Sequence, residues 1–371
     1  MIAFSVCMIV KNEEKKIIDC LEAIRKAWPC ESDIGPVLNE IVILDTGSSD
    51  STLEVVSSQI QIDSRIKLYS YDWADDFSQA RNTAISHTLN DWLLVLDADE
   101  TVTCSDNSLI ESLMRGPIQR FGYIERRNHF EADGQDMIYT DRVERFFNKK
   151  AFHYEGSIHE QLMPVKYFPV PSEGISFVTG ICVEHTGYLG SADDLSAKSK
   201  RNEQLLLNEL KSDPDNPYIY FQLGQCYNGF DDSKALEYYS KGLSYDVDPS
   251  LEYVQMMVIA YGYALLHLEK FEEALGLEGI YDEFATSADF LTLMGVIYMR
   301  TGNYLKAMSE FLKATLCPIS HHEGANSFIP LFNMGLINEM AGEISSAIGY
   351  YQRCGDFRQA KERLEHLQEK K

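Results

Sequence analysis

The first hundred residues alternate short apolar runs with segments of helical periodicity, and this alternation constrains the fold more than any other feature of the sequence. We expect strands over residues 4–10, 40–44, 66–69 and 92–96, and helices over residues 14–27, 51–59 and 78–88. Strands that alternate with helices predict a parallel sheet with crossover helices. In such open sheets the ligand lies beyond the carboxyl ends of the strands, so that edge should carry the functional residues.

The chain beyond Pro217 follows a different pattern, which repeats. Four segments are each predicted to begin the first helix of a pair: Leu223-Gly224, 263–266, Met294-Gly295 and Met334-Gly335. A helix with small residues follows each of them, around Ala235, Ala274, Ala307 and Ala347. The spacing is roughly the ~34 residues of a tetratricopeptide unit, with insertions. Because small residues let paired helices approach while aromatic residues fill the gaps, we predict a solenoid of about four helical pairs.

These two patterns divide the chain into parts. At 371 residues the chain exceeds the about 250–300 residues at which single cores stop growing, so two domains are expected. We predict an α/β domain over residues 1–190, a linker helix over 191–215 and all-α helical repeats over 216–371. Residues 121–190 are charged, aromatic and Gly-rich without clean periodicity, and we interpret them as loops that carry function.

Charge and cysteine content argue against several classes of partner and compartment. The formal net charge of -24 makes nucleic acid a poor partner, because phosphate binding needs dense Lys and Arg. An acidic surface suits a cationic or neutral acceptor, although solubility alone would also explain it. The eight cysteines show no zinc-like spacing, which favours a reduced compartment. The first apolar run is too short to span a membrane and lacks signal-peptide features, so we expect a cytoplasmic protein.

The strongest local signal is a pair of acids, Asp97 and Asp99, at the end of the apolar run 92–96. In a strand, side chains two residues apart face the same way, so both acids could reach one ligand. Oxygen ligands of this kind suit Mg²⁺ or Mn²⁺, which in turn bind phosphate oxygens. The alternative interpretation is a strand end that the two acids simply cap.

Two further polar segments are predicted at the same edge of the sheet. Asp45 ends the second strand before a tight turn, where its carboxylate can accept a hydrogen bond from a nucleobase or ribose. Asp50, a few residues later, could merely cap the next helix. Arg81 can neutralise a diphosphate or contact the base, and its alternative role is a surface ion pair.

Motifs of several other enzyme classes are missing from the sequence. No Gly-x-Gly-x-x-Gly follows the first strand, and neither Gly-x-x-x-x-Gly-Lys-Ser/Thr nor Gly-x-Ser-x-Gly occurs. Dinucleotide oxidoreductase, P-loop NTPase and serine hydrolase functions are therefore unsupported.

Four motifs taken together resemble family 2 glycosyltransferases, whose catalytic domain has the GT-A type of α/β fold. In chain order they are residues 5–14 (SVCMIVKNEE), 45–52 (DTGSSDST), 76–82 (DFSQARN) and 97–99 (DAD). Three later segments and the repeats look like the branch that includes bacteriocin (glycocin) S-glycosyltransferases: residues 142–147, 156–160 and 183–188. The motifs are specific over about the first hundred residues, and the repeats are divergent.

Carried over by position, the resemblance implies a site for a UDP-sugar and a divalent metal ion. The residues implied to bind the nucleotide are Val10, Asn12, Glu13, Asp45, Arg81, Asp97 and Asp99, with Asp97 at the ribose. Asp99 would bind the metal, Mg²⁺ or Mn²⁺, with His185 as a further ligand. A structural histidine near a glycine turn is the alternative for His185. His153 and His159 are weaker candidates that we leave outside the metal shell.

The resemblance also implies a single in-line displacement that inverts the sugar carbon as the nucleoside diphosphate leaves. A metal ion would stabilise charge on the diphosphate, and a base would take the acceptor proton. The candidate catalytic residues are Asp99, through the metal, and Glu160, as the base. Pairing of Glu160 with Arg142 or Arg145 is the alternative. UDP-glucose and UDP-N-acetylglucosamine are the leading donors by resemblance.

Several acceptors and roles stay open at this point. Our first hypothesis is a Cys or Ser side chain of a peptide, because helical repeats offer an extended surface for a peptide. A thiol, with a pKa of ~8.5, would relax the need for a base. The second hypothesis is a cell-envelope glycan or lipid-linked acceptor. A hypothesis of another class is a non-catalytic peptide-binding protein, against which the presence of Asp97 and Asp99 argues. The repeats could instead mediate homodimerisation.

Overall fold

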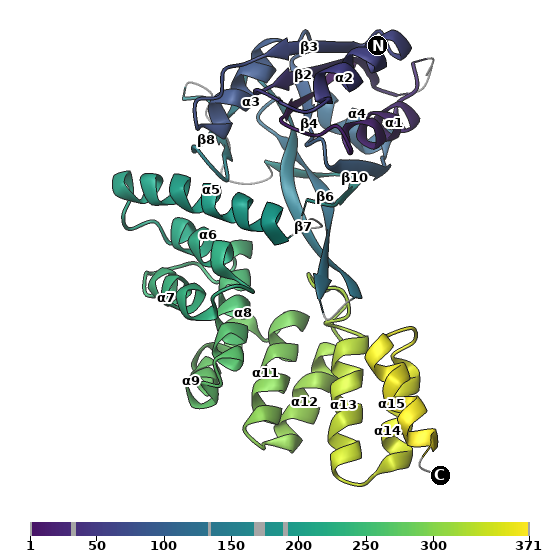
Figure 1. The fold of residues 1–371 in the computed structure, drawn as a ribbon, viewed down its shortest axis with the longest axis vertical. Helices are drawn as coiled ribbons and strands as arrows, with labels where there is room; N and C mark the ends of the chain where they lie inside the picture. The colour runs from purple at the N-terminus through teal and green to yellow at the C-terminus, as the bar shows by residue number, and fades with distance from the viewer. Residues whose placement is uncertain (1, 31–34, 133–134, 167–174, 188–191, 370–371) are drawn as a thin grey trace. The chain divides into compact units, whose positions relative to one another are not determined.

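The computed structural model of the chain describes residues 2–30, 35–132, 135–166, 175–187 and 192–369 (Figure 1). It divides into two compact units, residues 1–195 and residues 196–371. The first is an α/β domain on a mostly parallel sheet and the second is all helical, which confirms the predicted fold class. The predicted boundary between residues 190 and 191 lies outside the described residues.

The N-terminal unit contains an eight-stranded sheet and a two-stranded sheet. The strands are β1 (Ala3–Val10), β2 (Val37–Asp45), β3 (Ile66–Ser70), β4 (Trp92–Val95), β5 (Glu100–Cys104), β6 (Phe121–Ala132), β7 (Gln135–Asn148), β8 (Phe152–Glu155), β9 (Gln161–Pro164) and β10 (Ser176–His185). The helices are α1 (Ile17–Ala27), α2 (Thr52–Ile62), α3 (Phe77–Ser86) and α4 (Asn107–Arg115). In the large sheet the strand order is β3-β2-β1-β4-β7-β6-β10-β5.

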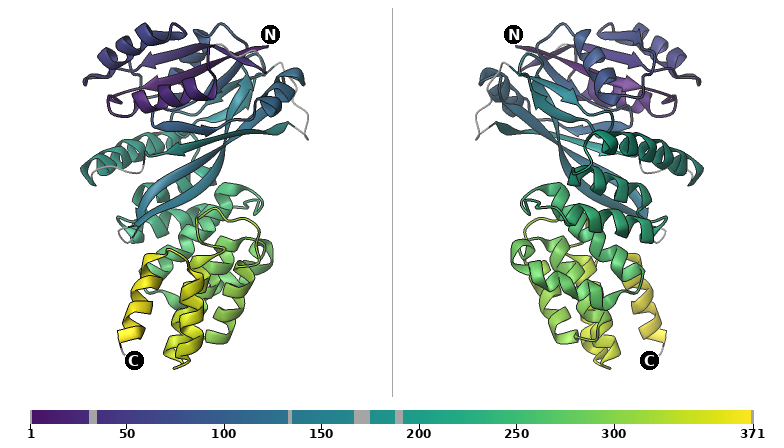
Figure 2. Two further views of the ribbon diagram at one scale, coloured as in Figure 1. Left: turned by 90° about the vertical axis from the view of Figure 1, so that its right-hand side faces the viewer. Right: turned by 90° about the vertical axis from the view of Figure 1, so that its left-hand side faces the viewer.

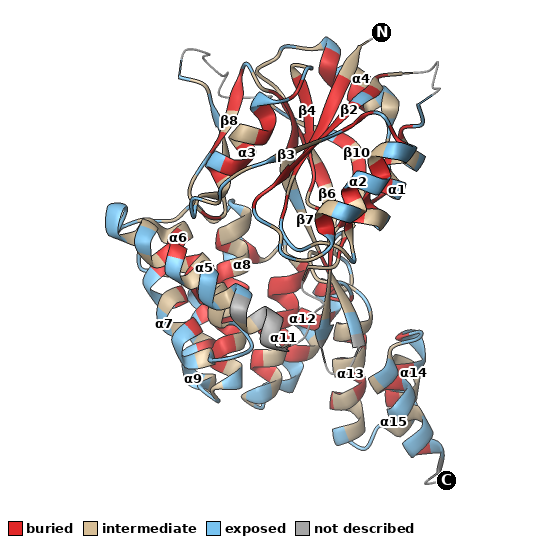
Figure 3. Ribbon diagram, turned by 45° about the horizontal axis from the view of Figure 1, so that its top comes forward, coloured by how far each residue is buried: buried red, intermediate tan, exposed pale blue. Residues whose placement is uncertain are grey.

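Helices cover both faces of the parallel half of the large sheet, and this half agrees with the sequence prediction. On one face Leu21 of α1 and Leu113 of α4 belong to the same buried cluster as Val6 of β1. On the other face Ala84 of α3 shares a buried cluster with Val42 of β2. Figure 3 shows β2 and β4 as largely buried strands, and β1 is buried to a similar degree. Strands buried on both faces are apolar almost throughout, which made them recognisable in the sequence.

The interpretation of residues 121–190 as loops is wrong for most of their described part. β6 and β7 form a long antiparallel hairpin, visible as a twisted ribbon in Figure 1, and β10 pairs with β6 in parallel. These strands place charged residues such as Arg126 and Arg145 in buried ion pairs on one face. Charges at positions that face inward removed the apolar alternation by which a strand is normally recognised.

The C-terminal unit is a series of helices that pack in pairs. Helix α5 (Ala192–Ser212) spans the division between the units. It is followed by α6 (Pro217–Tyr227), α7 (Asp232–Leu243), α8 (Glu252–His267), α9 (Phe271–Leu275), the 3-10 helix η1 (Gly276–Ile280), α10 (Tyr281–Phe284), α11 (Ala288–Arg300), α12 (Tyr304–Ala314), α13 (Phe328–Met340), α14 (Ile344–Arg353) and α15 (Arg358–Glu369). Sequential helices pack on one another, as for α11 to α14 in Figure 1, and Figure 2 shows this helical part of the chain from two further sides.

Glycine and aromatic residues hold the paired helices together. A Cβ on Gly224 of α6 would lie 2.2 Å from the ring of Tyr239 on α7. The same relation joins Gly295 to Phe311, with 2.5 Å, and joins Gly335 to Tyr351, with 2.4 Å. The sequence predicted that these glycines begin their helices, which is wrong: α6, α11 and α13 begin at Pro217, Ala288 and Phe328. The glycines lie inside the helices because that is where the partner's ring crosses.

Among the described residues, no helix combines the length and apolar character needed to cross a bilayer.

Candidate functional site

The loops that follow β1 and β2 are joined at the carboxyl edge of the sheet. Val10 pairs with Asp45 in the parallel ladder, and Thr46 N donates to Val10 O (2.9 Å). Asn12 adopts a φ of 58°, and its Oδ1 accepts a hydrogen bond from Ser49 N (2.8 Å). The nucleotide residues predicted in these two loops therefore lie beside each other.

Asp45 is buried and its carboxylate closes its own turn. Oδ2 accepts hydrogen bonds from Gly47 N (3.0 Å) and Ser48 N (3.2 Å). Gly47 has a φ of +99°, a conformation that favours glycine, so the turn sequence and the acid form one unit. Glu13 N donates to Thr52 Oγ1 (2.8 Å) at the start of α2, which ties the first loop to the helix. The predicted base contact of Asp45 would have to use its remaining lone pairs.

Asp97 lies just beyond β4 between two guanidinium groups. Arg81 Nη2 donates to Oδ1 (2.8 Å) and Arg145 Nη2 donates to Oδ2 (2.9 Å). Burial by itself raises the pKa of Asp97, but the charges of Arg81 and Arg145 outweigh it and hold that pKa well below its usual range. The two arginine side chains are only 7% and 9% exposed. Asp97, whose own side chain is 27% exposed, therefore remains an anion against two buried arginines.

Glu160 belongs to the same cluster. Its carboxylate accepts a hydrogen bond from Arg81 Nε, so it pairs with Arg81 rather than with Arg142 or Arg145 as the sequence alternative had it. His159, the residue before it, adopts a φ of 52°. Arg81 thus joins Asp97 to Glu160, and the acid that we predicted as a base lies beside the predicted nucleotide contacts.

Glu100 and Arg126 belong to the same cluster, and neither was predicted from the sequence. Glu100 is fully buried and accepts a hydrogen bond from Asp97 N (2.9 Å), while Arg126 Nη1 and Arg145 Nη2 lie 3.7 and 3.9 Å from its Oε1. Burial raises the pKa of Glu100. Arg145 was considered only as a possible partner of Glu160. Glu100 directly follows the acidic pair, but no sequence signal indicated that Arg126 and Arg145 would reach it from the hairpin.

Three side-chain atoms in this cluster are buried without a hydrogen-bond partner among the described residues: Arg81 Nη1, Arg145 Nη1 and Glu100 Oε1. Buried polar atoms are normally paired, so an unpaired group needs an explanation such as water, an ion or a ligand. Two guanidinium nitrogens without an acceptor are suited to an anionic group. The cluster therefore has unused capacity for a negatively charged ligand.

Asp99 faces His185, the last residue of β10. His185 Nε2 lies 3.5 Å from Asp99 Oδ2, and Lys16 Nζ lies 3.8 Å from the same oxygen. Burial raises the pKa of Asp99, but the neighbouring His185 lowers it by more, so the net shift is downward. A Cβ on Gly187 would lie 2.4 Å from His185 Nε2 and 2.6 Å from Asp99 Oδ2. Both atoms thus pack so closely against Gly187 that a side chain at this position would overlap them.

The argument that Asp97 and Asp99 face the same way because they share a strand is wrong. β4 ends at Val95 and residues 98–99 form a turn, so the alternation of a strand does not apply to the two acids. Asp97 contacts arginines, whereas Asp99 contacts His185 and Lys16. Nor does Asp45 join them around one ion, because its carboxylate is bound to its own turn.

The residues present fit a metal ion only in part. The Asp99 carboxylate and the His185 imidazole, which both lie beside Gly187, are suitable donors for Mn²⁺ or Mg²⁺. The described residues hold no group of three or more His, Cys, Asp or Glu side chains arranged for a metal. Mg²⁺ commonly uses one or two protein carboxylates and takes its other ligands from water and substrate phosphates. An ion at Asp99 and His185 would therefore need diphosphate or water oxygens.

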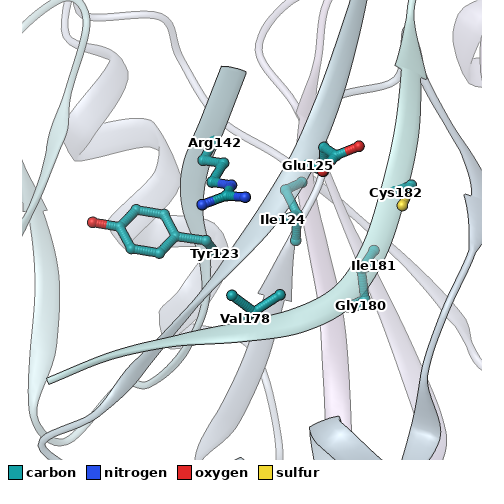
Figure 4. A pocket seen from close by; sticks show the side chains of 8 residues that line it. All are labelled: Tyr123, Ile124, Glu125, Arg142, Val178, Gly180, Ile181 and Cys182. Atoms are coloured by element: carbon teal, nitrogen blue, oxygen red, sulfur yellow. The ribbon is translucent and has the colours of Figure 1, made fainter. Parts of the chain in front are cut away.

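A small pocket lies in the same unit, separate from these charged groups. Its walls come from β6, β7 and β10 and include Tyr123, Arg142, Val178 and Cys182 (Figure 4). None of the predicted site residues is among its described lining residues.

Comparison with known proteins agrees with the sequence motifs. Residues 5–117 match the model of glycosyl transferase family 2, so the N-terminal unit contains a family 2 glycosyltransferase domain. The SPbeta prophage-derived glycosyltransferase SunS of Bacillus subtilis is 29% identical over 246 residues, which cover 64% of this chain and 52% of SunS.

Two other relatives differ in their descriptions. A TPR repeat-containing protein of Synechococcus elongatus is 28% identical over 246 residues, 65% of this chain and 56% of the relative. A lipopolysaccharide core biosynthesis glycosyltransferase of Rhizobium meliloti, LpsC, is 25% identical over 167 residues, 44% of this chain and 56% of the relative. The chain spans about half the length of the curated relatives it matches.

Proposed function

We propose that the protein is an inverting, metal-dependent glycosyltransferase that moves a sugar from a UDP-sugar to a Cys or Ser side chain of a peptide. The observation that carries the proposal is the charged cluster beyond β4 of a family 2 glycosyltransferase domain. There Asp97 and Glu160 share Arg81, and Asp99 faces His185. The unpaired guanidinium nitrogens of the cluster supply the positive charge that a nucleoside diphosphate requires.

The uridine is assigned to the joined loops after β1 and β2. Val10, Asn12, Glu13 and Asp45 meet there, and Arg81 reaches the same edge from α3 through its ion pair with Asp97. Ser48 and Ser49 hold Asn12 from both its backbone nitrogen and its side-chain oxygen. A loop fixed in this way presents backbone groups to a base at little ordering cost.

The metal ion is assigned to Asp99 and His185. When bound, Mg²⁺ or Mn²⁺ would act there as a Lewis acid that stabilises negative charge on the departing diphosphate. Asp99 is kept ionised by its surroundings, as a ligand must be. Lys16 lies beside Asp99 and supplies further positive charge at the same place.

Glu160 is assigned as the base that takes the acceptor proton. Its carboxylate accepts a hydrogen bond from Arg81, which also donates to Asp97. A thiol, with a pKa of ~8.5, gives up its proton far more readily than an aliphatic hydroxyl. This chemistry favours Cys over Ser as the acceptor side chain.

A peptide acceptor is further supported by the charge and architecture of the chain. The net charge of -24 favours a basic peptide, and helical repeats commonly present an extended binding surface. The alternative is a cell-envelope glycan acceptor, which the relative named for lipopolysaccharide core biosynthesis favours. Both hypotheses use the same donor site.

Incubation of the purified protein with Mn²⁺ or Mg²⁺, a panel of UDP-sugars and a basic Cys-containing peptide tests the proposal. The expected result is a hexose-sized or N-acetylhexosamine-sized gain in peptide mass that Asp99→Ala abolishes. Asp91→Ala is the matched control, because Asp91 lies just before β4 and forms an ion pair with the exposed Lys150. Transfer to a glycan but to no peptide would favour the alternative acceptor. UDP-sugar binding without transfer to any acceptor would favour a non-catalytic protein.

A further inference from the structure

His185 is held on its inner side by an asparagine that the sequence analysis did not identify. Asn128 lies on β6 directly opposite His185 in the parallel ladder with β10. Both residues are buried, and His185 Nδ1 lies 2.7 Å from Asn128 Oδ1. The ring therefore has one nitrogen against Asn128 and the other against Asp99.

The contacts of Asn128 determine which way its amide group points. Its Nδ2 lies 3.2 Å from the backbone oxygen of Tyr139 and 3.2 Å from Asp141 Oδ1, both of which only accept hydrogen bonds. If the amide were rotated by half a turn, its oxygen would face these two oxygens with no hydrogen between them. The amide nitrogen must therefore point toward Tyr139 and Asp141, and the amide oxygen toward His185.

Asp141 is itself fixed in place. Arg126 donates to both of its carboxylate oxygens, with Nε to Oδ1 at 3.0 Å and Nη2 to Oδ2 at 2.6 Å. Such a two-point pair specifies geometry as well as energy. A continuous chain of contacts thus runs from Arg126 through Asp141 and Asn128 to the imidazole of His185.

An amide oxygen can only accept, so the ring nitrogen that contacts it must carry hydrogen. In neutral His185 the proton is then on Nδ1, and the lone pair is on Nε2. Nε2 is the nitrogen that lies 3.5 Å from Asp99 Oδ2, and both atoms pack against Gly187. The contacts thus select the form of the ring in which the outer nitrogen can bind a cation.

We propose that Asn128 is a positioning residue for a divalent cation at Asp99 and His185, because it holds His185 in the Nδ1–H form. The inference rests on the metal site of the proposed function and adds to it the residue that prepares one ligand. Mutation of the residue that orients a metal-binding histidine typically lowers metal affinity by about 10–100-fold.

The first test needs no variant and no metal. Long-range ¹H–¹⁵N spectra distinguish the Nδ1–H form of a neutral histidine ring from the Nε2–H form. They are recorded on the metal-free full-length protein at a pH high enough for the ring to be neutral. The chain has nine histidines, so the His185 signals are assigned by their loss in His185→Gln. We expect the Nδ1–H form. An Nε2–H ring would overturn the proposal, whether or not the protein is an active transferase.

The second test measures Mn²⁺ affinity in the presence of saturating UDP, from the electron paramagnetic resonance signal of free Mn²⁺. Asn128→Leu should raise the dissociation constant by about 10–100-fold. Asn148→Leu, which removes another buried asparagine of the same sheet, is the matched control and should leave the constant within about twofold. Equal affinity in the wild type and Asn128→Leu would overturn the role of Asn128 alone. A wild type that takes up no Mn²⁺ would overturn the metal site and with it the proposal.

Discussion

Two aspartates, one in each unit of the chain, differ in how completely their carboxylates are hydrogen-bonded. In the repeat unit, Asp289 Oδ1 accepts hydrogen bonds from His322 N (2.9 Å) and His322 Nδ1 (2.8 Å), and Oδ2 accepts from His321 N (2.9 Å). In the N-terminal unit, the carboxylate of Asp97 is held by Arg81 and Arg145, and the Nη1 atom of each arginine has no hydrogen-bond partner among the described residues.

The two aspartates differ in whether the groups around them are all hydrogen-bonded. Asp289 anchors the loop around His322, and backbone N–H groups of that one segment donate to both of its carboxylate oxygens. The cluster around Asp97 combines residues from α3, β7 and the loop after β8, and it leaves two buried guanidinium nitrogens unpaired. An incomplete network lowers stability unless something completes it, so it indicates a place where a ligand binds.

The largest effect is expected from Asp289→Ala. Removal of this acid leaves two backbone N–H groups and a histidine in a partly buried loop without their acceptor, which should cost about 3–5 kcal/mol of unfolding free energy. Chemical denaturation followed by circular dichroism measures the loss. Asp248→Ala, at an exposed turn of the same unit, is the control. The comparison fails if Asp289→Ala unfolds at the same denaturant concentration as the wild type.

Arg145→Met should act on turnover more than on stability. Arg145 orients Asp97 and provides one of the unpaired nitrogens, so its loss should lower transfer by about 100-fold, as for one donor at a site of developing charge. Transfer rate and thermal unfolding are measured on the same sample. Arg115→Met, which removes an exposed arginine of α4, is the control. A large drop in stability with unchanged transfer would mean that the Asp97 cluster is as structural as Asp289.

Gly187→Ala should weaken metal binding by about 10-fold without unfolding the domain. The added methyl group would lie within 2.6 Å of both Asp99 Oδ2 and His185 Nε2, so these atoms would have to separate. Mn²⁺ affinity reports the effect. Gly279→Ala, whose added Cβ would meet nothing within 4 Å, is the control. Unchanged Mn²⁺ affinity would show that the two atoms do not share an ion.

The pH dependence of the repeat unit sharpens the comparison further. Burial raises the pKa of Asp289, but the hydrogen bond and charge of His322 lower it below the usual value, so the ionised form is favoured in the folded state. Its stabilising contribution is complete above the unfolded-state pKa of ~3.9 and is lost as pH falls toward the lower folded value. Denaturation at pH 6 and at pH 3 should show a steeper loss in the wild type than in Asp289→Asn. Equal losses in both would contradict the prediction.

The smallest signal should come from Trp73. The other two tryptophans, Trp28 and Trp92, are buried, whereas Trp73 is half-exposed beside Lys11 in the loops at the nucleotide edge. Addition of UDP should therefore change the emission of Trp73 by a small fraction, and Trp73→Phe should abolish that change. A change of equal size in Trp73→Phe would place the nucleotide elsewhere.

The sequence determined the parallel half of the sheet and the helical pairs, because both follow from local periodicity. Strands buried on both faces are continuously apolar, and glycines opposite aromatic rings repeat with the pairs. The turn after β2 was also predictable, since Asp45 accepts a hydrogen bond from Gly47 within the turn itself. Asn12 was identified only through the family resemblance, and it bonds to Ser49, which is distant in the sequence.

Only the tertiary structure decided which groups surround each acid. Arg145, Arg126 and Asn128 reach the site from the β6–β7 hairpin, where inward-facing charges had hidden the strands from a periodicity argument. Asp97 and Asp99 are separated by one residue, yet the end of β4 at Val95 and the turn after it give them different partners. Which side chains meet depends on strand pairing across large sequence distances, and local pattern carries no information about that pairing.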